Sequence, residues 1–169
     1  MNHLSIEHLS KISSVREPQT NRPRVFIVHG HDVAAKEQVA RFVQQLGLEP
    51  VILHEQPNFG RSIIEKLELN SNVDFVVVLL TPDDLGKRAS TDDEFSSRAR
   101  QNVWFELGYF IGKLGRHRVC ALHKHPVEIL SDYFGVIYIP IDTGDSWRLA
   151  LARELKAASM PINTEALFA

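Results

Sequence analysis

The sequence predicts one α/β domain built around an open, mostly parallel sheet. From Arg24 onward, short apolar runs alternate with segments of helical periodicity, which is typical of strands joined by crossover helices. Residues 75–80 are all apolar, as expected of a central parallel strand covered on both faces. A chain of 169 residues can bury one sizeable core. We therefore expect helices on both faces of the sheet, joined to it by right-handed crossovers.

The first predicted unit is a strand, a turn and a helix. Residues 25–28 form the apolar strand, and Gly30 marks the turn that follows it. Asp32 is placed to cap the helix, and Gly47 is placed to end it in a left-handed conformation. The helical stripe between them consists of Ala35, Val39, Phe42, Val43 and Leu46.

The second unit begins with a strand at residues 51–53 and a turn at residues 58–60. A shorter helix follows, with its apolar residues at Ile63, Ile64 and Leu67. The central strand 75–80 comes next and ends abruptly at Thr81.

The second half of the chain repeats the alternation. Residues 86–99 are a charged connection, of a length typical of functional or mobile loops. The next helix carries the apolar stripe Val103, Leu107, Phe110, Ile111 and Leu114. The last predicted elements are strands at 119–122 and 136–139 and a closing helix at 146–158.

Five strands in the flavodoxin-like order 2-1-3-4-5 fit this alternation. In such sheets ligands bind beyond the carboxyl ends of the strands, where the first and third strands diverge. The loops at 29–32, 54–62 and 81–84 all fall there. We expect residues 24–158 to form the domain, 1–23 to be a polar linker with a short helix around Leu4, Leu9 and Ile12, and 159–169 to be a tail.

Composition limits the partners and the compartment. Nineteen lysines and arginines nearly balance 21 aspartates and glutamates, so we expect neither a nucleic acid nor an anionic membrane as a partner. Cys120, the single cysteine, stands in an apolar run, which indicates a buried thiol in a reducing compartment. Since no signal peptide or membrane span is visible, we expect a cytoplasmic protein.

Several common catalytic motifs are absent. The sequence has no phosphate-binding P-loop, no dinucleotide-binding glycine fingerprint and no serine nucleophile elbow. His29, His31 and Asp32 are suitable ligands for zinc or manganese, but no second cluster of such residues accompanies them. We therefore expect no metal, and interpret these three as residues of a strand-end turn.

Glu106 is the strongest catalytic candidate. On a helical wheel it lies roughly 80° from the centre of the apolar stripe, so it borders the core without pointing into it. It also lies near the helix N-terminus, whose dipole favours an ionised carboxylate. Such a carboxylate could bind a ribose or stabilise a cationic sugar. An ordinary solvated or dipole-capping glutamate remains the alternative.

The same wheel places Phe105 and Tyr109 on the outward face of this helix. Either another copy of the chain or a terminal segment would cover them, or they are scattered exposed residues of the kind that most proteins carry.

Four collinear segments carry a family resemblance: residues 25–32, 56–66, 78–84 and 100–112. They resemble bacterial TIR-like predicted nucleotide-binding domains and look like the TIR domains of CBASS and Pycsar antiphage effectors. The resemblance extends from residue 24 to about residue 158. It implies a flavodoxin-like TIR fold that hydrolyses NAD+ to nicotinamide and ADP-ribose products, usually after activation by assembly through TIR–TIR contacts.

The resemblance also implies roles for individual residues. The family's catalytic glutamate matches Glu106, which would act on the nicotinamide ribose, and the flexible loop after the second strand matches residues 54–62. NAD+ would be the substrate, without a further cofactor. The expected substrate-binding residues are Gly30, His31, Asp32, Thr81 and Asp83 along the nucleotide, Phe59 and Trp104 for stacking, Arg61 or Arg100 near phosphate, and Gly60, Ser62 and Asn102.

The resemblance leaves activation and activity open. The sequence shows no cyclic-nucleotide sensor domain, so a separate nucleotide-sensing partner is one expectation. A nucleoside 2-deoxyribosyltransferase-like enzyme, with Glu106 as covalent nucleophile, is an alternative. A non-catalytic TIR adaptor is another, although a pure scaffold does not need the carboxylate.

Overall fold

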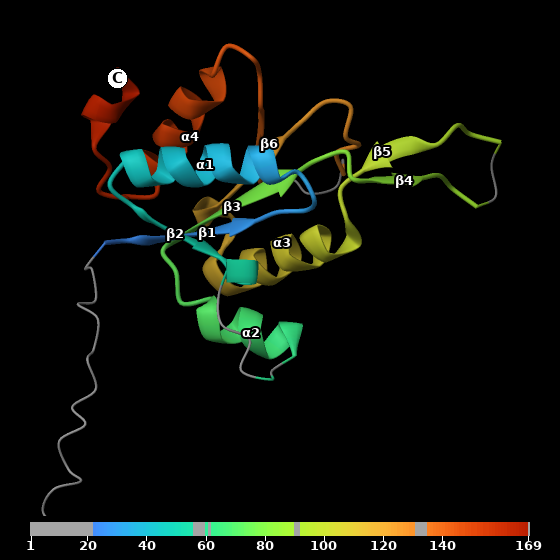
Figure 1. Cartoon of the computed structure of the whole chain (residues 1–169), viewed down its shortest axis with the longest axis horizontal. Coiled ribbons are helices and arrows are strands. Elements are labelled where there is room, and N and C mark those ends of the chain that lie inside the picture. The colour runs from blue at the N-terminus through green and yellow to red at the C-terminus, as the bar shows by residue number, and fades with distance from the viewer. Residues whose placement is uncertain (1–21, 56–59, 61, 90–91, 131–134, 169) are drawn as a thin grey trace, which may run out of the picture.

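The computed structural model describes residues 22–55, 60, 62–89, 92–130 and 135–168. Its core is a parallel sheet of five strands in the order β2-β1-β3-β6-β7 (Figure 1). The strands are β1 (Arg24–Val28), β2 (Glu49–Ile52), β3 (Phe75–Leu80), β6 (Val119–His123) and β7 (Ile137–Pro140). Taken in chain order, the strands of this sheet have the predicted order 2-1-3-4-5, which confirms the fold class.

The central strand β3 fixes the layers. All six of its residues are buried, and it pairs with β1 on one side and β6 on the other. Because strand side chains alternate between faces, Phe75, Val77 and Leu79 enter one core cluster. Val76 and Val78 enter a second cluster on the opposite face, together with Leu80. The uninterrupted apolar run therefore fills two cores at once.

Helices cover both faces of the sheet (Figure 1). On one side lie α1 (Val33–Gln45) and α4 (Ser146–Ala157), and on the other lie α2 (Ile63–Asn70) and α3 (Gln101–Leu114). Asp32 caps α1, as predicted, because its Oδ1 accepts a hydrogen bond from Ala35 N at 2.9 Å. Gly47, with φ of +83°, follows the end of α1 in the predicted left-handed conformation. Within the described residues, short 3-10 helices lie at Leu53–Glu55, Arg116–Arg118 and Thr164–Leu167.

The chain after α4 packs onto the fold. Met160 is buried, and Ile162 and Leu167 pack against the core cluster under α1 and α4. Asn163 N donates a hydrogen bond to Leu46 O at 2.8 Å. The domain boundaries at 23/24 and 158/159 remain predictions, and the helix predicted around Leu4, Leu9 and Ile12 lies outside the described residues.

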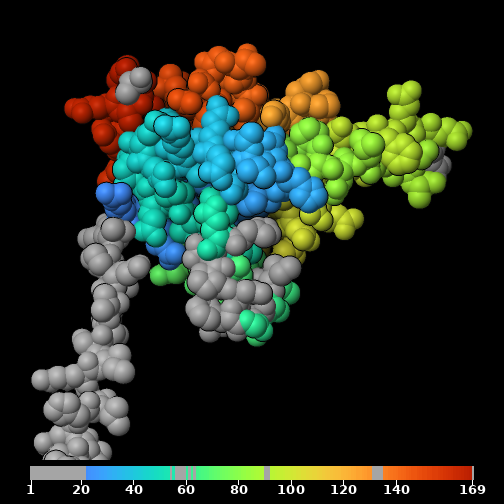
Figure 2. All heavy atoms as spheres, in the orientation of Figure 1, coloured from blue at the N-terminus to red at the C-terminus, as the bar shows by residue number. Residues whose placement is uncertain are grey.

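A small hairpin stands where the sequence predicts an irregular connection. The strands β4 (Asp84–Gly86) and β5 (Ser96–Arg98) pair antiparallel and form the yellow-green arm that projects from the body (Figures 1 and 2). Glu128 fixes its base, since its Oε2 lies 2.6 Å from Arg98 Nε and 2.8 Å from Ser96 Oγ. Three-residue strands with little apolar content carry almost no periodic signal, so the prediction of a loop was wrong here.

The sequence analysis expected Cys120 to be buried and expected no membrane-spanning segment. Cys120 is a buried free thiol, and burial raises its pKa to about 12, which confirms the expected core position. Among the helices in the described ranges, none has the length and apolar content needed to span a bilayer.

Candidate active site at the carboxyl edge of the sheet

Gly30 and Asp83 meet beyond the carboxyl ends of the neighbouring strands β1 and β3. A Cβ atom added at Gly30 would lie only 1.8 Å from Asp83 Oδ2, so the carboxylate occupies the space that a side chain would need. The hydroxyl of Thr81 donates a hydrogen bond to the same Oδ2 at 2.8 Å. Three predicted site residues from two loops therefore form one packed group.

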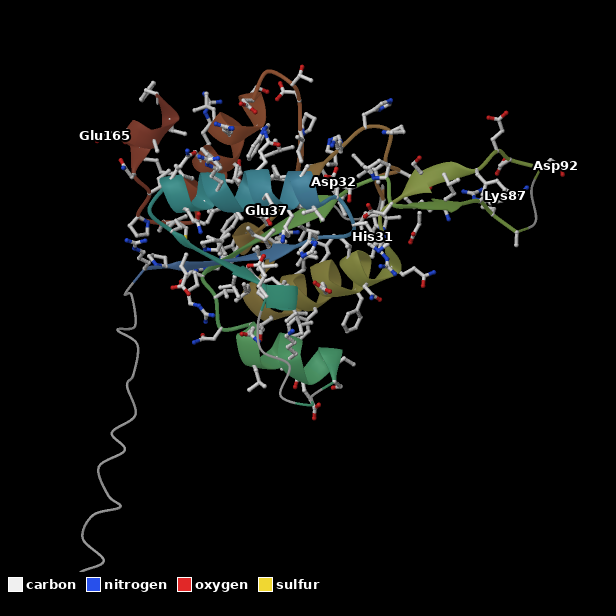
Figure 3. All side chains as sticks on the ribbon, in the orientation of Figure 1. His31, Asp32, Glu37, Lys87, Asp92 and Glu165 are labelled. Carbon is white, nitrogen blue, oxygen red and sulfur yellow. The ribbon has the colours of Figure 1, made fainter. Side chains whose placement is uncertain are left out.

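Side chains from two other parts of the chain, Lys124 and Arg100, contact the turn after β1. Asp32 Oδ2 lies 2.9 Å from Lys124 Nζ, at the end of β6. The pKa of Asp32 is lowered, mainly by the hydrogen bond from Ala35 N and then by Lys124. The imidazole of His31 contacts the guanidinium of Arg100, the residue that precedes α3. His31 and Asp32 lie side by side at the start of α1 (Figure 3).

Lys124 lies at the edge of the candidate site, and the sequence analysis did not predict it there. It stands 92 residues from Asp32, and only the placement of β6 beside β3 brings it close. A lysine just after a predicted strand was the available signal, since such positions face the ligand side of a parallel sheet.

The start of α3 contributes the predicted Arg100, Asn102 and Trp104. The side chain of Arg100, the N-cap residue, makes no capping hydrogen bond, and Asn102 is exposed in the first turn. An uncapped helix N-terminus favours anions. Trp104 is half-buried and packs against the core cluster beneath α3, so only part of its ring remains for a ligand.

Glu106 lies in the second turn of α3, half-buried, as the helical wheel predicted. Burial raises its pKa to about 7 from an ordinary value of 4.5. In the described part of the chain, no hydrogen bond or ion pair reaches its carboxylate. Desolvation favours the neutral carboxyl group, whereas the nearby helix N-terminus favours the ionised form.

The remaining predicted residues come from the segment before α2. Ser62 caps α2 in a reciprocal pair with Glu65: Glu65 N donates to Ser62 Oγ at 3.3 Å, and Ser62 N donates to Glu65 Oε2 at 2.8 Å. Gly60 has φ of +70°. Phe59 and Arg61 lie outside the described residues.

The side chains that the sequence analysis considered as metal ligands are those of His29, His31 and Asp32. Across the described ranges, no group of three or more histidine, cysteine, aspartate or glutamate side chains is arranged to hold a metal ion. His29 Nδ1 lies 2.8 Å from Gly30 O, and Asp32 is engaged by Ala35 and Lys124.

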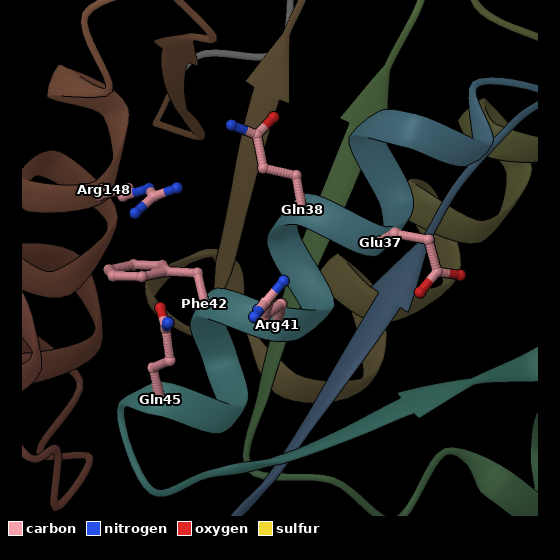
Figure 4. Close-up of a pocket in the computed structure, with 6 residues that line it drawn as sticks. All are labelled: Glu37, Gln38, Arg41, Phe42, Gln45 and Arg148. Atoms are coloured by element: carbon pink, nitrogen blue, oxygen red, sulfur yellow. The ribbon is translucent and has the colours of Figure 1, made fainter.

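Two shallow grooves lie along α1, away from the group formed by Gly30, Thr81 and Asp83. One, of about 410 Å³, runs between α1 and α4, where Arg148 approaches Phe42 with 5.7 Å between guanidinium carbon and ring centroid (Figure 4). The other, of about 400 Å³, runs between α1 and β2, beside Pro50 and Ile52. None of the predicted site residues lines either groove. The candidate site therefore rests on the chemistry at the strand ends.

Comparisons with known proteins agree with this fold. The family model for the TIR domain of the CAP12/Pycsar effector protein matches residues 24–143. The "Uncharacterized protein YuaY" of Escherichia coli (strain K12) is 48% identical over 153 residues, which cover 88% of this chain and 51% of YuaY. "Protein tirC" of Dictyostelium discoideum is 38% identical over 136 residues, which cover 75% of this chain and 68% of tirC.

The aligned lengths decide which conclusions from these relatives apply to this chain. This chain spans about half the length of YuaY, so the match concerns a domain rather than the whole of that relative. The family model, in contrast, covers most of this chain, from β1 through β7. The chain belongs to the family of CAP12/Pycsar effector TIR domains.

Proposed function

We propose that this chain is a TIR-domain NAD+ glycohydrolase, which converts NAD+ to nicotinamide and linear or cyclic ADP-ribose in bacterial antiphage defence. The observation that carries the proposal is Glu106, a half-buried carboxylate without a described partner on the helix that starts at the ligand edge of the sheet. A carboxylate that folding desolvates and leaves unbonded is typical of functional sites. Membership of an effector family supports the biological role.

The chemistry needs little beyond this carboxylate. In NAD+ the nicotinamide is already cationic, so the bond from C1′ to nitrogen breaks with its electron pair going to the ring, which leaves neutral. Ionised Glu106 would stabilise the oxocarbenium-like ribose that remains. Water then bonds to C1′ and loses a proton, which gives ADP-ribose; attack by the adenine of the same molecule gives the cyclic product.

The raised pKa of Glu106 fits a cationic substrate. With a pKa of about 7, the carboxyl group is about half ionised at neutral pH. A nicotinamide cation nearby favours the ionised form, so binding of NAD+ would release a proton. We expect kcat/KM to rise with pH through about 7 and then level off.

The surrounding residues suit the rest of the nucleotide. Arg100 and His31, which contact each other across the start of α3 and the turn after β1, would bind the diphosphate. Asp83, held by Thr81 over Gly30, would accept a hydrogen bond from a sugar hydroxyl. Trp104 and Phe59 are the stacking candidates, and Asn102, Gly60, Arg61 and Ser62 would border the ligand.

The test is nicotinamide release from NAD+ by concentrated protein, with a crowding agent added to promote TIR–TIR assembly. Glu106→Gln should lower turnover at least about a hundredfold, since it removes the charge that stabilises the transition state. Glu165→Gln is the matched control, because Glu165 lies at the left end of the molecule, well away from His31 (Figure 3).

Two other outcomes would favour a different function for this chain. Absence of turnover in protein shown to be assembled would contradict it and favour an adaptor, or a domain that waits for a separate nucleotide-sensing partner. A glycosyl group trapped on Glu106 would favour the deoxyribosyltransferase-like reaction.

A further inference from the structure

Ser71 joins the end of α2 to the middle of α3. Its side chain is fully buried, with 0% exposure, and its hydroxyl donates a hydrogen bond to Glu68 O at 2.6 Å. The same oxygen accepts hydrogen bonds from Tyr109 Oη at 3.1 Å and from Lys113 Nζ. A hydroxyl has one donor and two acceptor positions, and all three are occupied here. We call Ser71, Tyr109 and Lys113 the Ser71 cluster.

The α3 side of the Ser71 cluster is firmly attached to the core. Tyr109 and Lys113 lie one turn apart on α3, so they share a face. The ring of Tyr109 packs edge-on against Phe110, with 5.2 Å between centroids, and Phe110 packs against Phe26 of β1 at 4.7 Å. The outward Tyr109 expected from the helical wheel is therefore corrected, because the end of α2 covers it.

The geometry excludes a nucleophilic role for Ser71. A serine beside a lysine and a tyrosine resembles the constellations that activate a hydroxyl for attack. Here the serine has no exposed surface for a substrate to reach, and its own proton is committed to Glu68 O. The Ser71 cluster is therefore a connection between two helices.

Most of the described side chains in the rest of α2 are exposed. Of the α2 side chains that the structure describes, Leu67 alone is buried, whereas Ile64 and Leu69 are each more than half exposed. At the opposite end from Ser71, the hydrogen bonds described for the exposed Ser62 stay within its own helix, with Glu65 and with Lys66 N. Ser71 therefore fixes the C-terminal end of α2, whereas the described side chains of Ile64 and Glu65, near its N-terminal end, are exposed.

We propose that the Ser71 cluster is the pivot of α2 and sets the position of Ser62 relative to Glu106. Both helices meet at the cluster: Glu106 lies one turn before Tyr109 on α3, and Ser62 is the N-cap of the eight-residue α2. A small rotation at Ser71 is amplified along α2, which is about 12 Å long. Tyr109 and Lys113 act as positioning residues. The consequence for NAD+ rests on the proposed function.

Hydrogen exchange tests the pivot without reference to activity. Tyr109→Phe deletes one bond of the cluster and keeps the ring, and Ser71→Ala deletes the central oxygen. We expect amide exchange in residues 66–70 to accelerate roughly five- to tenfold in both variants, with residues 36–45 of α1 unchanged. Lys113→Met should act in the same direction, and Lys156→Met, an exposed lysine on α4, is its matched control.

Two exchange results would overturn the pivot. One is unchanged exchange in α2 in both Tyr109→Phe and Ser71→Ala. The other is equal acceleration in α1 and α2, because that would show loss of global stability rather than release of one helix.

Kinetics with NAD+ separate positioning from general damage. If Ser62 is displaced while Glu106 stays fixed, Tyr109→Phe should raise KM at least about threefold and leave kcat within about twofold. A fall in kcat at unchanged KM would contradict the positioning role. If the wild-type chain shows no turnover, the proposed function fails, and the exchange result alone decides whether the pivot exists.

Discussion

Folding places Glu106 where burial disfavours its ionised form. Val103 and Leu107, its neighbours on α3, are fully or almost fully buried, and the carboxylate between them and solvent is half-buried without a described partner. Desolvation of this kind destabilises the ionised form and raises the pKa. The same property makes the carboxylate available to a cationic substrate, so stability and the proposed activity make opposite demands on this residue.

Substitution of Glu106 should change stability in a pH-dependent way. Because its pKa is higher in the folded protein than in the unfolded chain, its contribution to stability is present below pH 4.5 and is lost as pH rises through about 7. At about 1.4 kcal/mol per pH unit, the loss is at most about 3 kcal/mol. We expect Glu106→Gln to be about 1 to 3 kcal/mol more stable than wild type at pH 8, and nearly equal at pH 4.

Denaturant titrations at the two pH values measure this difference, with Glu165→Gln as control. Equal stability of wild type and Glu106→Gln at pH 8 would show that the carboxylate is not desolvated in the folded protein.

At the residue scale, local chemistry was predictable and long-range chemistry was not. The cap of α1 follows from Asp32 and the residues next to it, and the structure confirms it. The charge state of Glu106 depends on how α3 packs against the sheet, which no local pattern encodes. The position of Tyr109 depends on Ser71, 38 residues earlier in the chain.

The β4–β5 hairpin shows how much an element can depend on its base. Gly86 leaves room for Arg98, since an added Cβ would lie 2.7 Å from its guanidinium. Arg98 and Ser96 then both bond Glu128, and Glu128 N donates to Ser97 O at 2.7 Å. Leu85 and Phe95 on this arm are 71% and 63% exposed, so the arm has little core of its own. Its order therefore comes from Glu128.

Glu128→Gln should loosen this arm without unfolding the protein. The pKa of Glu128 is lowered, first by the hydrogen bond from Arg98 and then by that from Ser96, so both bonds favour the ionised carboxylate. Both partners are substantially exposed, and such pairs contribute at most about 1 kcal/mol. We expect faster amide exchange across residues 84–98 and a change in Tm of only a few degrees. A fall in Tm of more than about 10 °C would show that the hairpin supports the main fold.

Elements with a long apolar signal were found, and those without one were missed. The prediction for β3 matches its observed bounds, and other strand ends differ by one or two residues, as for β2. The hairpin escaped because its strands are held by Glu128, which stands 30 residues after Arg98.

At the scale of the whole molecule, the sheet order follows from the alternation of strands and helices. Each crossover helix returns the chain to the same end of the sheet, so the ligand edge was predictable before any contact was known. The residues that meet at this edge were harder to predict than the edge itself. Gly30, Asp83 and Thr81 were expected, whereas Lys124 required the β3–β6 pairing.

Cys120 offers a measure of global opening. It lies on β6 with 1% exposure, and its raised pKa leaves almost no thiolate at pH 8. We expect alkylation by iodoacetamide at pH 8 to proceed only as fast as the whole domain unfolds, and to accelerate with guanidinium in parallel with the loss of helical circular dichroism. Fast alkylation without denaturant would show that β6 opens locally.

Both borders of the main sheet contain a proline, Pro50 in β2 and Pro140 at the end of β7. Proline has no amide hydrogen, so a foreign strand that approached either border would meet a gap in the row of donors. Fibril-like growth by strand addition is thereby discouraged. The two prolines thus protect the concentrated protein against association through its sheet edges.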